Sequence, residues 1–486
     1  MRREVRDAIF TAAQLNTPGI LGLTGRVWRW AWNAMEDKIF HLIRLCADSG
    51  HHPKTWRSAI AVAIQKPNRD YANPRSYRLV QLLEVLGKTL ERLQARRLSY
   101  IAAKYNLFPP TQFGSILGRS AQDAVMSIVH DIEAVWNHNR AVTMLTFNII
   151  GYFNSIPHSY LIDTLRDFHI PIPLVRWVIS FIQDRSATIS LDGKRDSLRP
   201  TKTGLPQGSC TSPILAAFFT APMGKVVEEG TYHRIHENPE LSSLYVAGRA
   251  TMFPFTIYVD DGSISASAHD RTTTTKLAEL AFLEAHAWLT IRGMKLDQNK
   301  SKLIHFTRSN RGHHSGPGPS ATIPSSDPTI TKEIPPAKTI RYLGVWLDSQ
   351  LNFGKHIRRT TSKAIGAAHA LRLLRNSMHS IHQTLARQLY YGAILPVTTY
   401  GLPIIWKSKN GNVLSSLIKM QNRCLQMITG AFRTTSINTM EIEASIPPMD
   451  IWLNYKLEME ALRMSRLANV MTRVTTGNCR DSHGTH

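Results

Sequence analysis

The chain has 486 residues with 58 Lys and Arg against 35 Asp and Glu, and its formal net charge is +23 at pH 7. A hydrophobic content of 43% excludes a disordered chain, and the length favours two or three subdomains over a single core. Four cysteines without a CxxC pair exclude a disulfide scaffold and a zinc finger, and the basic charge favours a polyanionic partner such as nucleic acid.

The chain order of predicted elements changes from helical to mixed and back to helical. Apolar periodicity predicts helices over 27–50, 82–105, 120–137, 159–168, 173–183 and 272–292, and strands over 59–64, 142–149, 255–259, 263–267 and 302–307. Residues 309–338 are rich in Gly, Pro and Ser, which predicts a flexible surface insertion. A strand over 341–347 and helices from 355 to about 469 follow. The predicted class is α+β with a helical C-terminal part.

Two adjacent carboxylates, Asp260 and Asp261, follow a strand-like run and precede Gly262. Carboxylate oxygens at a hairpin tip suit Mg²⁺, whereas an isolated Asp-Gly pair more often marks an ordinary turn. The loop Thr203–Ser209, which opens a helix at Ser212-Pro213, favours the metal site, because its glycines let the backbone approach a flat ligand.

These motifs together resemble reverse transcriptases, in particular those of LINE-type (non-LTR) retrotransposons of fungal character. The resemblance covers about residues 17–470 and includes the sequences at 73–83, 112–120, 147–157, 204–213, 258–261, 293–306, 342–348, 429–435 and 446–448. It implies a right-hand polymerase with fingers, a palm built on an antiparallel sheet, and a helical thumb. The implied division is 1–140 for an N-terminal extension and fingers, 141–308 for the palm, 309–338 for the insertion, and 339–486 for the primer grip, thumb and post-thumb region.

The resemblance also implies nucleotidyl transfer with two metal ions, Mg²⁺ or Mn²⁺, which activate the primer hydroxyl and hold the triphosphate. It makes Asp260 a direct metal ligand and Asp261 its partner, and gives Lys300 a part in protonating the leaving group. The residues implied to meet the incoming nucleotide are Phe153, which rejects a ribose 2′-hydroxyl, Gln207 and Gly208 in the pocket, and Arg78 and Lys66 at the triphosphate.

The first palm motif departs from the family pattern F-D-x-x-G-x-F-D at both aspartates, which are Asn148 and Asn154 here. The first of these is the indispensable metal ligand, and an amide oxygen is a neutral and weaker one. Losing one preorganised electrostatic contact costs on the order of 10²–10³ in rate. We therefore expect impaired catalysis.

Other departures from the family pattern can arise by the same kind of mutation. Leu79 and Leu117 replace prolines, and Lys302 replaces a glutamate that is frequent in the family. Asp→Asn and Glu→Lys are single G-to-A changes in the codon, and Pro→Leu is a single C-to-T change. We therefore expect a decayed element copy. No endonuclease, RNase H cluster or Cys/His knuckle is evident, so we also expect an open-reading-frame fragment.

The expected function is RNA-directed DNA polymerisation with an RNA template, a DNA primer and dNTPs, supported by the element RNA and a nucleic-acid-binding companion protein. A catalytically dead nucleic-acid-binding remnant is the alternative, and a group II intron maturase fits the post-thumb residues less well. Without an apolar run of roughly 18 residues or a signal core, we expect an intracellular protein, in the nucleus or the cytoplasm, with no membrane partner.

Overall fold

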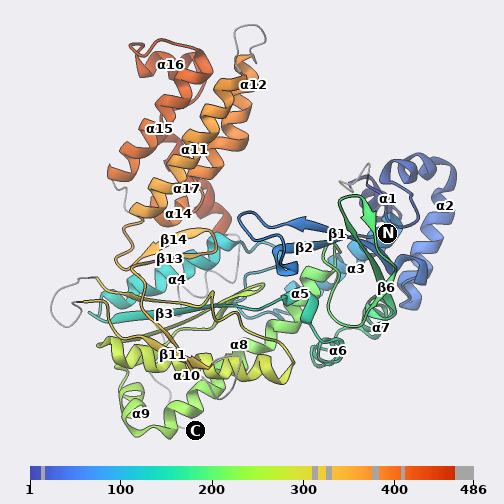
Figure 1. Cartoon of the computed structure of the whole chain (residues 1–486), viewed down its shortest axis with the longest axis horizontal. Helices are drawn as coiled ribbons and strands as arrows, with labels where there is room; N and C mark the ends of the chain where they lie inside the picture. The colour runs from blue at the N-terminus through green and yellow to red at the C-terminus, as the bar shows by residue number, and fades with distance from the viewer. Residues whose placement is uncertain (12–16, 309–315, 325–330, 375–381, 407–410, 466–486) are drawn as a thin grey trace.

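The computed structural model describes residues 1–11, 17–308, 316–324, 331–374, 382–406 and 411–465. Its helices and strands form three groups, which are seen at the right, the lower left and the upper left of Figure 1. We call them the N-terminal group, the central group and the C-terminal helices. Within the described ranges, no helix is both long enough and apolar enough to cross a bilayer.

The N-terminal group is built on a sheet with the strand order β2-β1-β4-β5, in which β6 also pairs with β4. The β1 and β2 strands are antiparallel, and β4 joins β1 in parallel from later in the chain. The strands are β1 (Ser58–Gln65), β2 (Tyr77–Leu82), β4 (Arg185–Leu191), β5 (Lys194–Arg195) and β6 (Arg199–Thr201), and the helices are α1 (Arg2–Phe10), α2 (Gly25–Ser49), α3 (Val85–Lys104), α6 (His158–Asp167) and α7 (Ile172–Ile182).

The central group is an antiparallel sheet with the order β10-β3-β9-β7, in which β8 also pairs with β9. Its central strand β3 is buried along its length up to Asn148, as its apolar run predicts. The strands are β3 (Ala141–Asn148), β7 (Ala250–Met252), β8 (Thr256–Tyr258), β9 (Asp261–Ala268) and β10 (Lys302–Phe306), and the helices are α4 (Ala121–Trp136), α5 (Tyr152–Ser155), α8 (Ser212–Glu237), α9 (Pro239–Val246) and α10 (Arg271–Ile291). Helices α8 and α10 lie on the side of the sheet opposite α4 (Figure 1).

The C-terminal helices pack on the central group through a shared apolar core. Met144 of β3 and Phe306 of β10 belong to the same buried cluster as Tyr390 and Leu417 of the helices. The helices are α11 (Gly354–Leu374), α12 (Gln383–Leu389), α13 (Leu395–Thr398), α14 (Leu402–Ile405), α15 (Gly411–Thr429), α16 (Ile437–Ala444) and α17 (Met449–Ser465). At the far end of α17, Arg463 donates to the buried carboxylate of Asp123 on α4, which ties the last described helix to the central group.

Two segments differ from the sequence prediction. The predicted strand 341–347 is a hairpin of β13 (Thr339–Tyr342) and β14 (Val345–Asp348), because Leu343 and Gly344 turn the chain with φ of 43° and 86°. Within the predicted flexible insertion, β11 (Ala321–Pro324) and β12 (Thr331–Ile334) pair as an antiparallel hairpin. The buried side chains Ala321, Ile323 and Ile334 join the main core, so this part of the insertion is packed.

Candidate active site

A tight hairpin between β8 and β9 carries the two aspartates. Tyr258 pairs with Asp261, so Val259 and Asp260 form the turn. Val259 has φ of 58°, which is an unusual conformation for a β-branched residue. The backbone of Gly114 packs against this turn, because a Cβ on Gly114 would lie 2.5 Å from the Val259 nitrogen. The turn is therefore held by close packing from a separate segment.

The turn consists of Val259 and Asp260, whereas the sequence pattern predicts a turn at 260–262. Gly262 is a strand residue of β9, and the Phe147 ring covers its Cα. A Cβ on Gly262 would lie 2.2 Å from that ring. The glycine is thus required by contact with the neighbouring strand, and Asp261 becomes the first residue of β9.

Asn148, at the end of β3, lies opposite Asp261 in the strand register. Its Nδ2 donates to Asp260 Oδ2 at 2.9 Å and to Asp261 Oδ1 at 2.9 Å. Its Oδ1 accepts from Lys300 Nζ at 3.0 Å. The amide thus bridges the two carboxylates and links them to the lysine.

The orientation of the Asn148 amide follows from the charges around it. If the amide were turned over, Oδ1 would face two carboxylates and Nδ2 would face the ammonium of Lys300. Both contacts would be repulsive, whereas the observed orientation pairs every donor with an acceptor. Asn148 therefore presents N–H groups, and not its oxygen, to the carboxylate pair.

The surroundings of Asp261 favour its neutral form. Burial raises the pKa of its carboxyl and the charge of Asp260 raises it further, while the Asn148 hydrogen bond and the charge of Lys300 act in the opposite direction. Lys300 also forms an ion pair with Asp297 at 3.2 Å, and the Asp297 amide donates to the carbonyl of Asn148 at 2.8 Å.

The two predicted triphosphate residues lie at the end of the β1–β2 hairpin where residues 66–76 connect the strands. Arg78 pairs with Ile64, and Lys66 donates through Nζ to the carbonyl of Arg75 at 2.7 Å. Partial burial lowers the pKa of Lys66, and the positive charges of Arg78, Lys300 and Arg69 lower it further. Because Lys300 belongs to the aspartate cluster, Lys66 is within electrostatic range of that cluster.

The loop with Gln207 and Gly208 packs against the same hairpin. The carbonyl of Gln207 accepts from the Gln81 amide at 2.6 Å, and a Cβ on Gly208 would lie 2.5 Å from the Gln81 oxygen. At its other end, the Leu205 amide donates to the carbonyl of Phe153 at 2.6 Å. The loop therefore connects β2 with α5, which carries Phe153.

The structure thus places all nine residues named from the sequence around one region. Asn148, Asp260, Asp261 and Lys300 are in direct contact, and Lys66, Arg78, Phe153, Gln207 and Gly208 surround them through the hairpin and the loop. Sequence reasoning missed Asp297, although its position three residues before Lys300 is a usable signal for an ion pair. It also missed the strained Val259, for which the sequence holds no signal.

The residues present fit a pair of divalent ions poorly. Hard cations require oxygen ligands, and two adjacent carboxylates supply them. The third position is an amide whose N–H groups face the carboxylates and occupy one oxygen of each. Among the described residues, no group of three or more His, Cys, Asp or Glu side chains could hold a metal ion.

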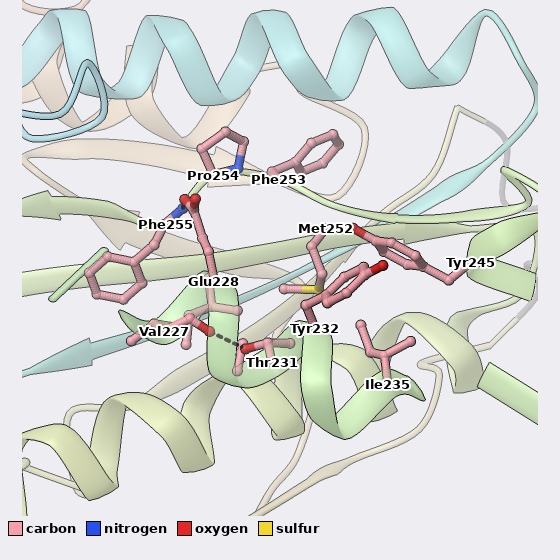
Figure 2. Close-up of a pocket in the computed structure, with 12 residues that line it drawn as sticks. Val227, Glu228, Thr231, Tyr232, Ile235, Tyr245, Met252, Phe253, Pro254 and Phe255 are labelled. Carbon is pink, nitrogen blue, oxygen red and sulfur yellow. Dashed lines mark hydrogen bonds between the residues drawn. The ribbon is translucent and has the colours of Figure 1, made fainter. Parts of the chain in front are cut away.

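A separate pocket lies between α8, α9 and the segment that joins β7 to β8. Figure 2 shows its mostly apolar lining, in which Glu228 reaches toward Phe255 and the rings of Tyr232 and Tyr245 lie side by side. Glu228 Oε1 accepts from the Phe255 amide at 3.0 Å. None of the nine predicted site residues lines this pocket, so it is distinct from the candidate active site.

Comparison with known protein families identifies the chain. The family model for reverse transcriptase (RNA-dependent DNA polymerase) matches residues 64–347, which is more than half of the sequence. The chain belongs to this family. Its α+β class is that of a right-hand polymerase, in which an antiparallel sheet forms the palm.

Individual relatives are mobile-element proteins of flies. The probable RNA-directed DNA polymerase from transposon BS of Drosophila melanogaster is 26% identical over 377 residues, which cover 78% of this chain and 39% of that protein. The RNA-directed DNA polymerase from mobile element jockey of the same species is 25% identical over 449 residues, covering 92% and 46%. The chain therefore spans less than half the length of these relatives.

Solved structures of low similarity include telomerase from Candida albicans in complex with a fragment of telomeric RNA. It is 10% identical with a TM-score of 0.41, and the alignment covers 88% of this chain and 72% of that one.

The charge arrangement predicts how Asn148→Asp changes stability. In a chelator at pH 8 the variant should be less stable than the unmodified chain by roughly 1–3 kcal/mol, because it replaces two hydrogen bonds to charged groups with repulsion. The extra carboxyl has a raised pKa in the folded state, so this deficit should disappear as the pH falls to about 4, where aspartates are protonated when unfolded. Mg²⁺ should also reduce it by binding the folded state.

Thermal unfolding followed by circular dichroism, with and without Mg²⁺, measures this change. Asn154→Asp is the matched control, because Asn154 is exposed on α5 and should give no metal-dependent change. If Asn148→Asp and the unmodified chain were equally stable in chelator at pH 8, the Asn148 amide would not stabilise the two carboxylates, which would contradict this prediction.

Proposed function

We propose that this chain is the polymerase part of a LINE-type retrotransposon protein that copies RNA into DNA, and that its catalysis is impaired. Membership of the reverse transcriptase family supports the reaction type, and the contacts of Asn148 support the impairment. The template is RNA, the primer is DNA and the substrates are dNTPs. The element RNA and a nucleic-acid-binding companion protein are the expected partners, and a nuclear or cytoplasmic location and a fungal source stay predictions.

In this proposal the side chains around the β8–β9 turn have separate roles in the reaction. Asp260 and Asp261 provide the negative charge at the reacting end of the primer, where Mg²⁺ or Mn²⁺ would activate the hydroxyl and neutralise the phosphates. Arg78 and Lys66 contact the triphosphate, and the electrostatic effect of Lys300 on Lys66 supports a position within range of the palm. Lys300 is placed beside the leaving group, although its bond to Asn148 and its ion pair with Asp297 restrain it.

The remaining residues define the nucleotide pocket. Phe153 is half-buried on α5 and restricts the space at the sugar, so that it rejects a 2′-hydroxyl. Gln207 and Gly208 form the wall that the base and sugar contact. Because the Asn148 N–H groups occupy one oxygen of each carboxylate, we expect cation binding at Asp260 and Asp261 to be weak.

A catalytically silent nucleic-acid-binding protein is the second candidate, and the bridging amide of Asn148 favours it. Such a protein would bind primer–template through Lys and Arg contacts with phosphate, so its affinity would fall steeply with salt. The two candidates differ in whether restoring the carboxylate restores synthesis.

Primer extension on an RNA template with Mg²⁺ tests the proposed function. The unmodified chain should extend feebly or not at all, and Asn148→Asp should gain at least about 10²-fold, the cost of one lost electrostatic contact. Asp260→Asn added to that variant should abolish the gain, and Asn154→Asp alone should give little. Robust extension by the unmodified chain would refute the impairment, while salt-dependent binding without extension by Asn148→Asp would favour the silent protein.

The decay of the element copy is a proposal about its gene. Compared with intact related copies, the coding strand should differ mostly by C-to-T and G-to-A changes, at silent and coding positions alike. Sequencing of such copies measures this spectrum. A balanced mixture of transitions and transversions would contradict it and leave Asn148 in need of a selected explanation.

A further inference from the structure

A buried glutamate on α3 lies beneath the loop that carries Gln207 and Gly208. Glu91 is fully buried, and its Oε2 accepts from the hydroxyl of Ser209 and from the amide of Cys210, the latter at 3.2 Å. Its backbone carbonyl accepts from Thr211 Oγ1 at 2.9 Å. Three successive loop residues are therefore bonded to one residue of α3.

These bonds also organise the start of α8. Ser209 Oγ donates to Glu91 and accepts from the amides of Thr211 at 3.0 Å and Ser212 at 3.3 Å. The first amides of a helix lack partners within the helix, and a negative charge near them is favourable. Glu91 therefore supports the helix start and the loop before it through the same carboxylate.

Two positively charged side chains, Arg185 of β4 and Lys88 of α3, act on the buried Glu91 carboxylate. Arg185, the first residue of β4, is only 4% exposed and donates to the carbonyl of Phe181 at 3.0 Å. Burial raises the pKa of Glu91, and the positive charges of Arg185 and Lys88 oppose that rise. A buried charge without a counter-charge is costly, and the positive charges of Arg185 and Lys88 reduce that cost for the Glu91 carboxylate.

The loop has little freedom between these bonds and the β1–β2 hairpin. Gln207 and Gly208 are in contact with Gln81 on one side, and Ser209 and Cys210 are bonded to Glu91 on the other. A shift of the Glu91 carboxylate would thus move the wall of the nucleotide pocket directly.

We propose that Glu91 is a positioning residue for the incoming nucleotide, which acts by fixing the loop Gln207–Ser212 between the fingers and the start of α8. This inference rests on the proposed function for its nucleotide, but the fixing of the loop does not depend on catalysis. Glu91 itself contacts no substrate, because its side chain is enclosed by α3, the loop and β4.

Hydrogen exchange on the full chain tests the fixing of the loop. In Glu91→Met, exchange at residues 204–212 should be at least about tenfold faster, because hydrogen bonds to a charged acceptor are lost. Glu91→Gln keeps an acceptor oxygen and should restore most of the protection. Ser209→Ala, which removes one bond from the loop side, should accelerate exchange if Glu91→Met fails to fold.

Gln94→Met is the matched control, since Gln94 is fully buried on the same helix and bonds to Arg97 instead of the loop. It should leave exchange at 204–212 unchanged. If the loop exchanged equally fast in the control and in Glu91→Met, the positioning role would be overturned. If Glu91→Met does not fold, the same comparison is made between the control and Ser209→Ala.

Steady-state kinetics in the Asn148→Asp background provide the functional readout. Glu91→Met should raise KM for dNTP by about tenfold with kcat changed by less than about threefold, and Glu91→Gln should recover most of the KM. A fall in kcat alone would contradict nucleotide positioning. If Asn148→Asp extends no primer, the proposed function fails, and the exchange experiment still decides whether Glu91 fixes the loop.

Discussion

The antiparallel pairing of β3 with β9 determines where Asn148 lies relative to the two carboxylates of the site. Its register places Asn148 opposite Asp261 and Phe147 opposite Gly262. A slip of one residue would turn each side chain to the other face of the sheet, and the buried run of β3 prevents such a slip. Core packing, and not attraction between the polar groups, therefore brings two carboxylates and the Asn148 amide within hydrogen-bonding distance.

Within that fixed frame, a change from Asp to Asn alters charge while leaving shape almost unchanged. An aspartate at 148 would add a third negative charge to a partly buried pair, which is tolerable only with cations bound. The asparagine instead donates to both carboxylates and accepts from Lys300, so the cluster is satisfied without metal. Under the proposed function, the same substitution would favour folding and oppose polymerisation, so an inactive chain could keep the family fold.

The sequence predicts the elements whose apolar pattern is strong, such as β3 and the strands around Asp260 and Asp261, and the resemblance supplies the set of site residues. The sequence does not predict local structure correctly where a backbone conformation or a contact with a distant residue determines it. Leu343 at positive φ divides a predicted strand into a hairpin, and Phe147 makes Gly262 a strand residue instead of a turn residue. The bonds of Glu91 to a loop far along the chain leave no local pattern in the sequence.

A titration of the unmodified chain with Mn²⁺, followed by electron paramagnetic resonance, tests most directly whether Asn148 blocks the cation site. The account predicts that Asp260→Asn changes Mn²⁺ binding by the unmodified chain little, because the bridging amide already prevents tight binding there. It further predicts that Asn148→Asp binds Mn²⁺ at least about tenfold more tightly, a difference of about 1.4 kcal/mol, and loses this gain with Asp260→Asn. Tight Mn²⁺ binding by the unmodified chain that Asp260→Asn removes would contradict the account.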